Sequence, residues 1–326
     1  MSGILLWVVG SRGLLGSHLC RALPHQVPKA RLWEAAPAHL SWTDPDRLAE
    51  ELGEAVAAFA ATVRAERTSW AVLWCAGRGI LNSTSETLEP EWFAWSRLLE
   101  LLGRHLARPS ESLAGIVFLA SSAGGIYGGS PGQVLTEYTP AQPNSLYGAH
   151  KLRMEQALRD WGEEFPSVSS LVGRISSLYG RGQDLHKAQG IIPHLSRCLI
   201  YRQPLNVFVS LDTRRDYLFV DDCAVQIAAS VRRLMVEPAR AVIKIIASED
   251  LSSVARIVGI FFRMVKHRPL VVLRQPREKQ RSSLKFRSEV WRDLEGLRKT
   301  DLATGIHLVH AHQLAIFRRG MLQPPS

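Results

Sequence analysis

Long hydrophobic runs are absent from this 326-residue sequence. The longest apolar stretches, such as Ile4–Val9 and Ile116–Ala120, fall far short of the roughly 20 residues that a helix needs to cross a bilayer, so we expect no membrane partner. The N-terminal residues also lack the basic segment and the small-residue cleavage site of a secretory signal peptide. These absences predict a cytoplasmic protein.

Cysteine is scarce as well, and the four cysteines do not form a metal-binding pattern. No Cys-x-x-Cys pair occurs, and no histidine stands at metal-ligand spacing beside any of them. Because cytosolic proteins rarely keep disulfides, the sequence predicts reduced thiols and no metal site. The residues concerned are Cys20, Cys75, Cys198 and Cys223.

Positive charge exceeds negative charge, and the formal net charge is +10. Much of the excess lies in Arg263–Arg298, whereas the first half of the chain is nearly balanced. A basic region of this kind suits nucleic acid, but it equally suits an anionic small molecule such as a nucleotide diphosphate. Charge alone does not separate the two kinds of partner.

Apolar runs rich in β-branched residues alternate with amphipathic stretches in the first half of the chain, as βαβ units and a parallel sheet require. We predict strands near 4–9, 30–33, 70–75, 115–120 and 168–174, and a further strand and helix over 216–235. We predict helices over Leu14–Leu23, Pro45–Arg64, Glu91–Ala107 and Tyr147–Trp161. The fold class is therefore α/β, with a Rossmann-type, doubly wound parallel sheet and a smaller C-terminal α/β lobe.

A glycine-rich turn directly follows the first predicted strand, has the spacing G-x-x-G-x-x-G and leads into a helix. Glycines there permit a tight turn and close approach of the backbone to a pyrophosphate, which the N–H groups of the helix N-terminus stabilise. The pattern is weak alone, but its place between a strand and a helix predicts a dinucleotide cofactor. The candidate contacts are Gly10, Arg12, Gly13, Leu14, Leu15 and Gly16.

Glu34 stands at the end of the second predicted strand, where such folds carry an acid for the adenosine ribose. A carboxylate there accepts hydrogen bonds from both ribose hydroxyls and repels a 2′-phosphate, so Glu34 favours NAD over NADP. NADP is not excluded, because Arg12 or Arg31 could meet a phosphate and Glu34 could simply face solvent.

Tyr147 and Lys151 form a Y-x-x-x-K pattern. Four residues make about one helical turn, so both side chains lie on one face of a helix, where the ammonium can stabilise a tyrosinate. Such a tyrosine can exchange a proton with a sugar hydroxyl while hydride moves to or from a nicotinamide. A hydroxyl from Ser122, at the end of the fourth predicted strand, would hold the same oxygen. We predict that Tyr147, Lys151 and Ser122 are catalytic.

With these pieces in order, the sequence resembles the extended short-chain dehydrogenase/reductases, the NAD-dependent epimerase/dehydratase family that includes UDP-glucose 4-epimerase. The resemblance covers most of the chain. It rests further on Cys75-Ala76-Gly77, which is similar to the family's cofactor-lining strand end, on Arg174–Gly180, which is similar to R-x-x-N-x-Y-G, and on Arg215–Asp222, which is similar to R-D-[FY]-x-x-V-x-D. The resemblance implies that Cys75, Ala76 and Gly77 line the cofactor together with Tyr147 and Lys151.

The resemblance also implies that Arg215 contacts a substrate diphosphate, and a guanidinium offers a fork of donors that matches phosphate oxygens. The alternative for Arg215 is an ion pair with Asp216 or Asp212. Arg277 and Arg281 fall where the family closes its substrate lobe over the diphosphate, so one of them could supply a second phosphate contact or could be solvated surface.

The chain departs from the family pattern at several positions. Counting back from Ile126-Tyr127-Gly128 puts the catalytic hydroxyl at Ala123, whereas counting forward to Tyr147 favours Ser122, and Ser121 stays open. Ala or Gly stands where the family's 4,6-dehydratases carry an Asp-Glu pair, which argues against that class because elimination lacks its proton donor.

Two further departures concern binding rather than catalysis. Ser177 stands where the family has a substrate-binding Asn, and a hydroxyl offers fewer donors and acceptors than an amide. Ser41 occupies the place of an adenine-contacting Asp, which leaves Trp42 as an apolar wall for the adenine ring.

The leading hypothesis is a nucleotide-sugar 4-epimerase that uses NAD and binds a nucleotide-diphosphate sugar, and no nucleic acid is expected as a partner. The alternatives are a 4-ketoreductase of a nucleotide-linked deoxysugar and a non-catalytic, nucleotide-binding Rossmann protein. We assign residues 1–175, with a returning segment at about 206–235, to the NAD(P)-binding domain and 176–326 mainly to the substrate-binding lobe. The resemblance implies a homodimer formed through two helices of each subunit.

Overall fold

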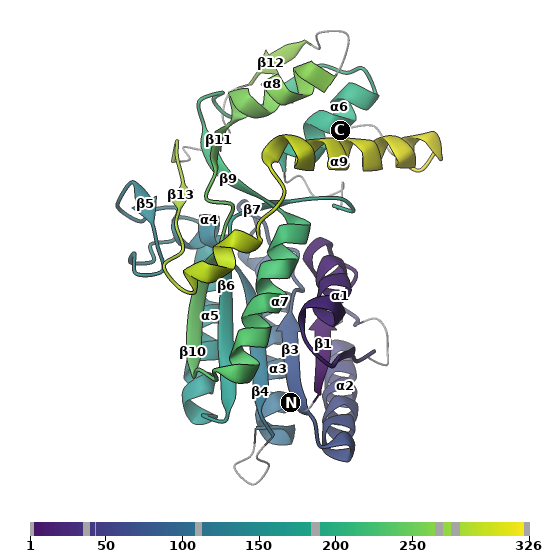
Figure 1. Cartoon of the computed structure of the whole chain (residues 1–326), viewed down its shortest axis with the longest axis vertical. Coiled ribbons are helices and arrows are strands. Elements are labelled where there is room, and N and C mark those ends of the chain that lie inside the picture. The colour runs from purple at the N-terminus through teal and green to yellow at the C-terminus, as the bar shows by residue number, and fades with distance from the viewer. Residues whose placement is uncertain are drawn as a thin grey trace.

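The structure is a computed structural model, and it describes residues 3–34, 40–42, 44–107, 113–183, 190–264, 270–274 and 281–322. Its centre is a six-stranded sheet with the order β10-β6-β4-β3-β1-β2, in which every pair of neighbours is parallel (Figure 1). The strands are β1 (Ile4–Val9), β2 (Ala30–Leu32), β3 (Ser69–Trp74), β4 (Gly115–Ser122), β6 (Val168–Ile175) and β10 (Ala241–Ile246). The predicted α/β fold with a doubly wound parallel sheet is confirmed.

Helices cover both faces of this sheet (Figure 1). One face packs against α1 (Leu14–Gln26) and α7 (Val220–Val236), and the other against α2 (Pro45–Glu66), α3 (Ser85–His105) and α5 (Leu146–Glu164). Alternate residues of β1 point to opposite faces, so Leu6 packs with the first helix layer and Trp7 with the second. Both faces are covered, which explains why the strands are continuous apolar runs.

A second group of elements lies beyond the carboxyl ends of the strands (Figure 1). It contains a three-stranded sheet of β11 (Leu251–Ser253), β9 (Arg214–Phe219) and β7 (Ser177–Tyr179), and a pairing of β8 (Leu205–Val207) with β12 (Val271–Leu273). The helices α6 (Ile191–Ile200), α8 (Val254–Met264) and α9 (Leu302–Arg318) pack around a separate apolar core. We call this group the upper lobe.

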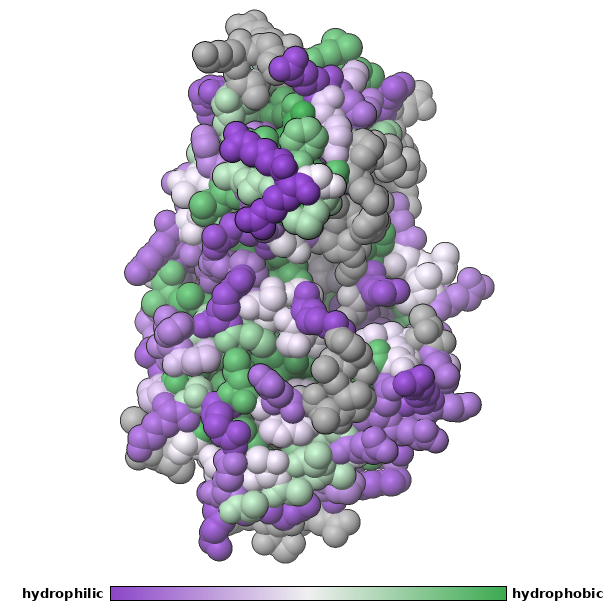
Figure 2. Space-filling model, turned by 90° about the vertical axis from the view of Figure 1, so that its right-hand side faces the viewer, coloured by the Kyte–Doolittle hydropathy of each residue, from purple (hydrophilic) through white to green (hydrophobic). Residues whose placement is uncertain are grey.

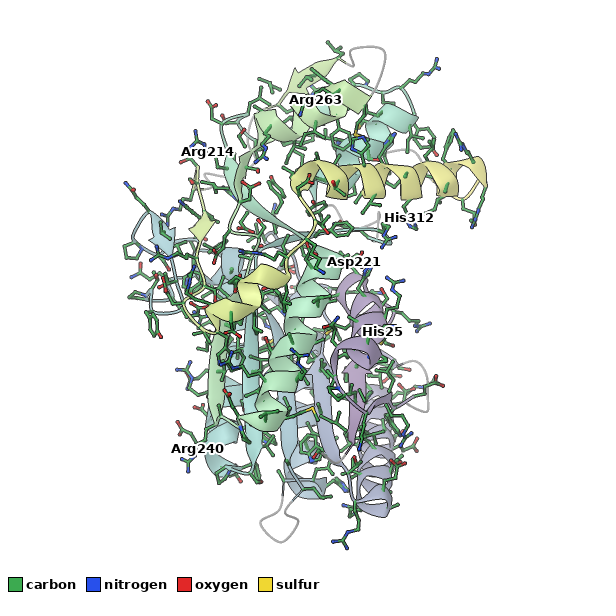
Figure 3. The ribbon with its side chains drawn as sticks, in the orientation of Figure 1. His25, Arg214, Asp221, Arg240, Arg263 and His312 are labelled. Atoms are coloured by element: carbon green, nitrogen blue, oxygen red, sulfur yellow. The ribbon has the colours of Figure 1, made fainter. Side chains whose placement is uncertain are left out.

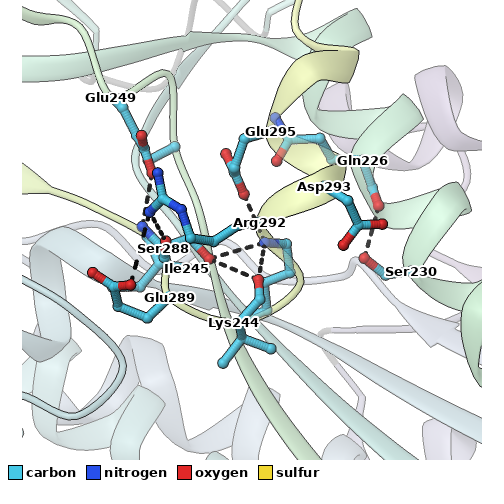
Figure 4. A network of polar contacts seen from close by, with 12 residues as sticks. Gln226, Ser230, Lys244, Ile245, Glu249, Ser288, Glu289, Arg292, Asp293 and Glu295 are labelled. Carbon is cyan, nitrogen blue, oxygen red and sulfur yellow. Dashed lines mark hydrogen bonds and ion pairs between the residues drawn. The ribbon is translucent and has the colours of Figure 1, made fainter.

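The edge strand β10 lies beyond the segment 206–235 that was expected to return to the sheet. It carries Lys244, whose side chain is fully buried. The ammonium donates to Ser288 Oγ at 2.9 Å, to the Val290 carbonyl at 2.7 Å and to Glu295 Oε1 at 2.7 Å (Figure 4). These bonds fasten the segment that holds β13 (Lys285–Phe286) and the short helix η1 (Arg292–Leu297) to the edge of the main sheet.

On the face drawn in Figure 2, apolar residues are interspersed with hydrophilic ones. Across the parts of the chain that the structure describes, no helix is both long and apolar enough to cross a bilayer.

Candidate active site

The glycine-rich turn joins β1 to α1. It lies next to the boundary between β1 and β3, where the strand order reverses. Open α/β sheets bind their ligands at such a point. Gly10 has a φ of +87°, and a Cβ there would lie 2.7 Å from the Ala76 amide nitrogen. A Cβ at Gly16 would collide with the Gly10 carbonyl group. Gly13 closes the turn by donating its N–H to the Gly10 carbonyl at 2.9 Å, and it caps α1 without a side chain. The glycines thus let the turn pack tightly against the end of β3 and the start of α1.

The end of β3 lies directly against this turn. The Cys75 amide donates to the Val9 carbonyl at 2.9 Å, which continues the ladder between the two strands. Gly77 has a φ of +150°, which favours glycine. The structure therefore brings Cys75, Ala76 and Gly77 next to the glycine-rich turn.

The residues predicted to lie near the adenosine differ in their exposure and in their contacts. Glu34 is exposed just beyond β2, whereas Arg31 forms an ion pair with Glu66 in the last turn of α2. That pair lies at the amino end of the strands, so Arg31 cannot serve a ribose phosphate. Ser41 donates its hydroxyl to Glu51 Oε1 at 2.9 Å, and Trp42 packs edge-on against Trp74 with ring centroids 5.9 Å apart.

Tyr147 and Lys151 lie one turn apart near the start of α5, whose first N–H groups are capped by Ser145. The Tyr147 ring lies in a slot between two glycines, because a Cβ at Gly79 would be 2.9 Å and one at Gly125 would be 3.2 Å from its ring carbons. The Lys151 ammonium is 5.9 Å from the ring centroid. The two predicted catalytic side chains are thus neighbours on one helix face.

Lys151 has a partner that sequence reasoning missed. Its ammonium donates to Glu91 Oε1 at 2.6 Å, and both side chains are buried, with 7% and 5% exposed. Burial lowers the pKa of Lys151, but the Glu91 carboxylate and then Tyr147 raise it above its ordinary value overall. Glu91 follows Leu88 and precedes Trp95 on the buried stripe of α3. A charged residue on an apolar stripe was the available signal.

The three candidates for the catalytic hydroxyl differ in their surroundings. Ser121 donates its hydroxyl to the buried Glu155, and Ala123 is fully buried. Ser122 is half-buried and accepts the Gly125 N–H at 3.1 Å as the cap of α4 (Ala123–Ile126). Gly125, whose N–H donates to Ser122 Oγ, also lies against the Tyr147 ring, so the start of α4 contacts both of these predicted catalytic side chains.

The predicted substrate contacts lie on adjoining segments. Ser177 is exposed on β7 and pairs with Tyr217 of β9, two residues beyond Arg215. Arg215 donates to the Arg281 carbonyl at 2.8 Å, and burial, together with the Arg281 charge, lowers the pKa of Arg215. Asp216 accepts instead from Ser176 and Ser248, so the alternative of an ion pair between neighbours in β9 is not supported.

Arg281 itself donates to the Ser130 carbonyl at 2.6 Å and to the Gly132 carbonyl. The structure brings Arg215 and Arg281 together, whereas Arg277 lies outside the described residues. The two positive charges lie near enough for the Arg281 charge to lower the pKa of Arg215.

A polar junction links the main sheet domain to the upper lobe. Asp221, at the start of α7, accepts from His18 of α1 and from Arg181 Nη2 at 2.7 Å. The hydrogen bond from His18 is the main cause that lowers the pKa of Asp221. Figure 3 shows Asp221 below α9, which carries His312, and the charges of Arg181 and His18 add to the burial that lowers the pKa of His312.

No cluster of His, Cys, Asp or Glu suited to a metal ion occurs among the residues that the structure describes. Burial raises the pKa of the Cys75 and Cys223 thiols, so neither is a nucleophile at neutral pH.

Comparisons with known proteins agree with this geometry. A family model described as the NAD dependent epimerase/dehydratase family matches residues 6–243. A dTDP-4-dehydro-6-deoxyglucose reductase of Escherichia coli is 32% identical over 106 residues, which cover 32% of this chain and 33% of the reductase. A UDP-glucose 4-epimerase of Mycolicibacterium smegmatis is 32% identical over 112 residues, which cover 34% of this chain and 36% of the epimerase. The chain thus aligns with about a third of the length of these relatives.

Among solved structures, a UDP-glucose 4-epimerase of Thermotoga maritima with UDP-glucose has a TM-score of 0.74 at 16% identity. The alignment covers 98% of this chain and 100% of that one. At this identity the likeness shows the fold.

Proposed function

Because the chain belongs to the NAD-dependent epimerase/dehydratase family, we propose that it is an NAD(P)-dependent nucleotide-sugar enzyme, and specifically a 4-epimerase that acts through a 4-keto intermediate. The observation that carries the proposal is the Tyr147–Lys151 couple on α5, with Ser122 at the carboxyl end of β4. A binding module would need neither the tyrosine nor the lysine.

The residues at the switch point fit NAD. Gly10, Gly13 and Gly16 let the turn pack closely on neighbouring backbone, and the N–H groups at the N-terminus of α1 that follows suit a diphosphate. The backbone of Cys75, Ala76 and Gly77 borders the same space, with Arg12, Leu14 and Leu15 at its rim. Glu34 would accept the ribose hydroxyls, and this favours NAD over NADP.

NAD, when bound, supplies the group that accepts hydride from C4 of the sugar and returns it to the opposite face. Tyr147 takes the proton of the C4 hydroxyl and gives it back to the 4-ketone after the sugar has turned. Ser122 Oγ orients the same oxygen, and the Lys151 ammonium stabilises the phenolate that forms in between. Ala123 and Gly124 bring no acid to this position, so a dehydratase is not proposed.

The nucleotide diphosphate would bind to Arg215 and Arg281, because Arg215 contacts the backbone of Arg281 and the two charges lie close enough to interact. Ser177, on the strand next to Arg215, would add a hydrogen bond to the sugar or the phosphate. In this proposal, residues 1–175 with the segment around 206–235 hold the cofactor, and residues 176–326 mainly hold the substrate.

A homodimer through α3 and α5 is part of the proposal. These helices lie side by side on one face of the sheet, and they leave Phe93 and Leu146 exposed, at 37% and 57%. Light scattering coupled to gel filtration measures the mass directly. A monomeric mass at micromolar protein concentration would refute the proposed dimer, but it would not bear on the proposed reaction.

One specific observation favours a 4-ketoreductase as second candidate. The relative named as a dTDP-4-dehydro-6-deoxyglucose reductase is 32% identical over 106 residues, and a reductase would use the same Tyr147 and Lys151. The epimerase needs no added cofactor, whereas the reductase consumes NAD(P)H in proportion to its product.

The test is turnover by the purified protein. UDP-, GDP- and dTDP-sugars are first screened with NAD and NADP by thermal shift, since a ligand that binds the folded state raises its melting temperature. We expect interconversion of C4 epimers, and Tyr147→Phe should lower kcat by about 100-fold or more. Tyr138→Phe is the matched control, because Tyr138 is 78% exposed. Oxidation of NAD(P)H by a 4-keto nucleotide sugar without epimer exchange would overturn the 4-epimerase in favour of the reductase.

A further inference from the structure

A buried ion pair lies near the carboxyl ends of β3 and β4. The Lys151 ammonium donates to Glu91 Oε1 at 2.6 Å and to the Ala120 carbonyl of β4 at 3.4 Å. The Glu91 carboxylate is packed against Gly77, just beyond β3, where a Cβ would lie 2.7 Å from both of its oxygens. The Lys151 and Glu91 side chains are only 7% and 5% exposed. The pair is therefore fixed between two strand ends and shielded from water.

The Glu91 carboxylate is not fully satisfied by this pair. Its second oxygen, Oε2, is buried and has no hydrogen-bond partner among the described residues, which is costly for a charged group. His150 Nε2 lies 3.9 Å from Oε1, but burial, ahead of the opposing charge of Glu91, lowers the pKa of His150, so its ring is neutral at neutral pH. The carboxylate can therefore act on a further positive group nearby.

The strand order places this pair at one end of the proposed cofactor site. In the sheet, β2, β1, β3 and β4 follow one another. Glu34, which is proposed for the adenosine ribose, follows β2, and the glycine-rich turn proposed for the diphosphate follows β1. A dinucleotide that continues in the same direction brings its nicotinamide to the ends of β3 and β4, where Gly77 and the ion pair lie.

The charge of the nicotinamide ring depends on its oxidation state. The ring of NAD carries one positive charge, and the ring of NADH carries none. An ammonium nearby disfavours the positive ring, whereas a carboxylate attracts it, and such charges act strongly where water is excluded. We propose that Glu91 selects the oxidation state of the cofactor, because its carboxylate offsets the Lys151 charge at the ring and stabilises the oxidised form relative to the reduced one.

This inference rests on the proposed function, since it concerns the cofactor of that reaction. An epimerase starts its cycle from the oxidised cofactor, which accepts hydride from C4 of the sugar. A carboxylate that stabilises this form therefore suits a 4-epimerase. A reductase starts from the reduced form and gains nothing from such a carboxylate. The roles proposed for Tyr147 and Lys151 in proton transfer are unaffected.

The experiment compares the dissociation constants of NAD and NADH, measured by titration calorimetry on the purified full chain. Glu91→Gln removes the negative charge and keeps an oxygen that can accept from Lys151. We expect the ratio of the NAD constant to the NADH constant to rise about tenfold or more. A purely structural defect would weaken both nucleotides alike and leave this ratio unchanged. Glu89→Gln is the matched control, because Glu89 lies on the same helix with a side chain that is 60% exposed, and it should not change the ratio.

A second variant keeps the test decisive if Glu91→Gln does not fold. Glu91→Gln/Lys151→Met removes both charges and leaves no unpaired ion in the interior, so its ratio should stay within about threefold of wild type. A ratio that moves about tenfold or more in the double variant, or one that is unchanged in Glu91→Gln, would overturn the proposal. If the expected ratios are found but no nucleotide sugar is turned over, only the proposed function is refuted. A protein that binds neither nucleotide would refute both.

Discussion

Replacing Asp216 by asparagine tests how a buried carboxylate without a cation controls stability. Asp216 is 1% exposed on β9, and its Oδ1 accepts from Ser176 Oγ at 2.6 Å and from the Ser248 amide at 2.8 Å. Among the described residues, no ion pair to Asp216 is present. Burial outweighs these hydrogen bonds and raises the pKa of Asp216 from 3.8 to about 6.

The sign follows from proton binding. Between these two values the folded protein binds more protons at Asp216 than the unfolded chain does, so the free energy of unfolding falls as pH rises. The stabilisation is fully present below the pKa of Asp216 in the unfolded chain, and it is lost as the pH rises through the pKa of Asp216 in the folded protein. A shift of about 2 units corresponds to about 3 kcal/mol in total, of which about 1.4 kcal/mol is lost between pH 5 and 8.

Urea unfolding of wild type and Asp216→Asn over pH 5 to 8 measures this loss. The asparagine side chain does not titrate. The free energy of unfolding of the variant, relative to that of wild type, should therefore rise by about 1.4 kcal/mol from pH 5 to pH 8. Asp212→Asn, at an exposed position nearby, is the control and should run parallel to wild type. Parallel curves for Asp216→Asn and wild type would refute the reasoning, because they would mean that Asp216 is ionised in the folded protein throughout.

Three further outcomes are expected. Gly16→Ala puts a methyl group against the Gly10 carbonyl, so the rise in melting temperature on adding NAD should vanish. An unchanged rise would contradict a diphosphate site at the glycine-rich turn. Glu155→Gln leaves the Arg174 guanidinium, now 4% exposed, without its charge partner, and urea unfolding should show a loss of about 3–5 kcal/mol; a loss below about 1 kcal/mol would be incompatible with a buried pair. Arg281→Ala should raise the KM for a nucleotide sugar about tenfold or more with kcat little changed, and steady-state kinetics with an unaltered KM would exclude a phosphate contact.

Five of the six strands of the main sheet were predictable, because they are apolar runs separated by amphipathic helices. The short strands β5 (Val134–Leu135), β8 and β12 were not, since two or three residues show no periodicity. α3 was predicted to begin at Glu91, after Pro90, but it begins at Ser85 and continues through Pro90, at the loss of one backbone hydrogen bond.

β10 and the partner of Lys151 were missed for one physical reason. Lys244 interrupts the run Ala-Val-Ile-Lys-Ile-Ile, and a lysine in such a place is typical of an exposed position. Its hydrogen bonds come from residues more than forty positions away, and no local pattern reveals them. Glu91 was predicted only as the first residue of a helix, and nothing local linked it to Lys151, sixty positions away. The glycine turn and the Y-x-x-x-K pair were found because their geometry is local.

The hydrogen bonds of Lys244 also determine how the protein unfolds. They tie a segment that follows the upper lobe in sequence back to the edge of the main sheet, so the chain enters that lobe and returns before α9. Neither part can melt without baring an ammonium that is otherwise wholly enclosed. We therefore expect a single calorimetric unfolding transition rather than two. A chain truncated before residue 284 should yield a sheet domain whose edge strand, β10, is uncovered and prone to aggregation.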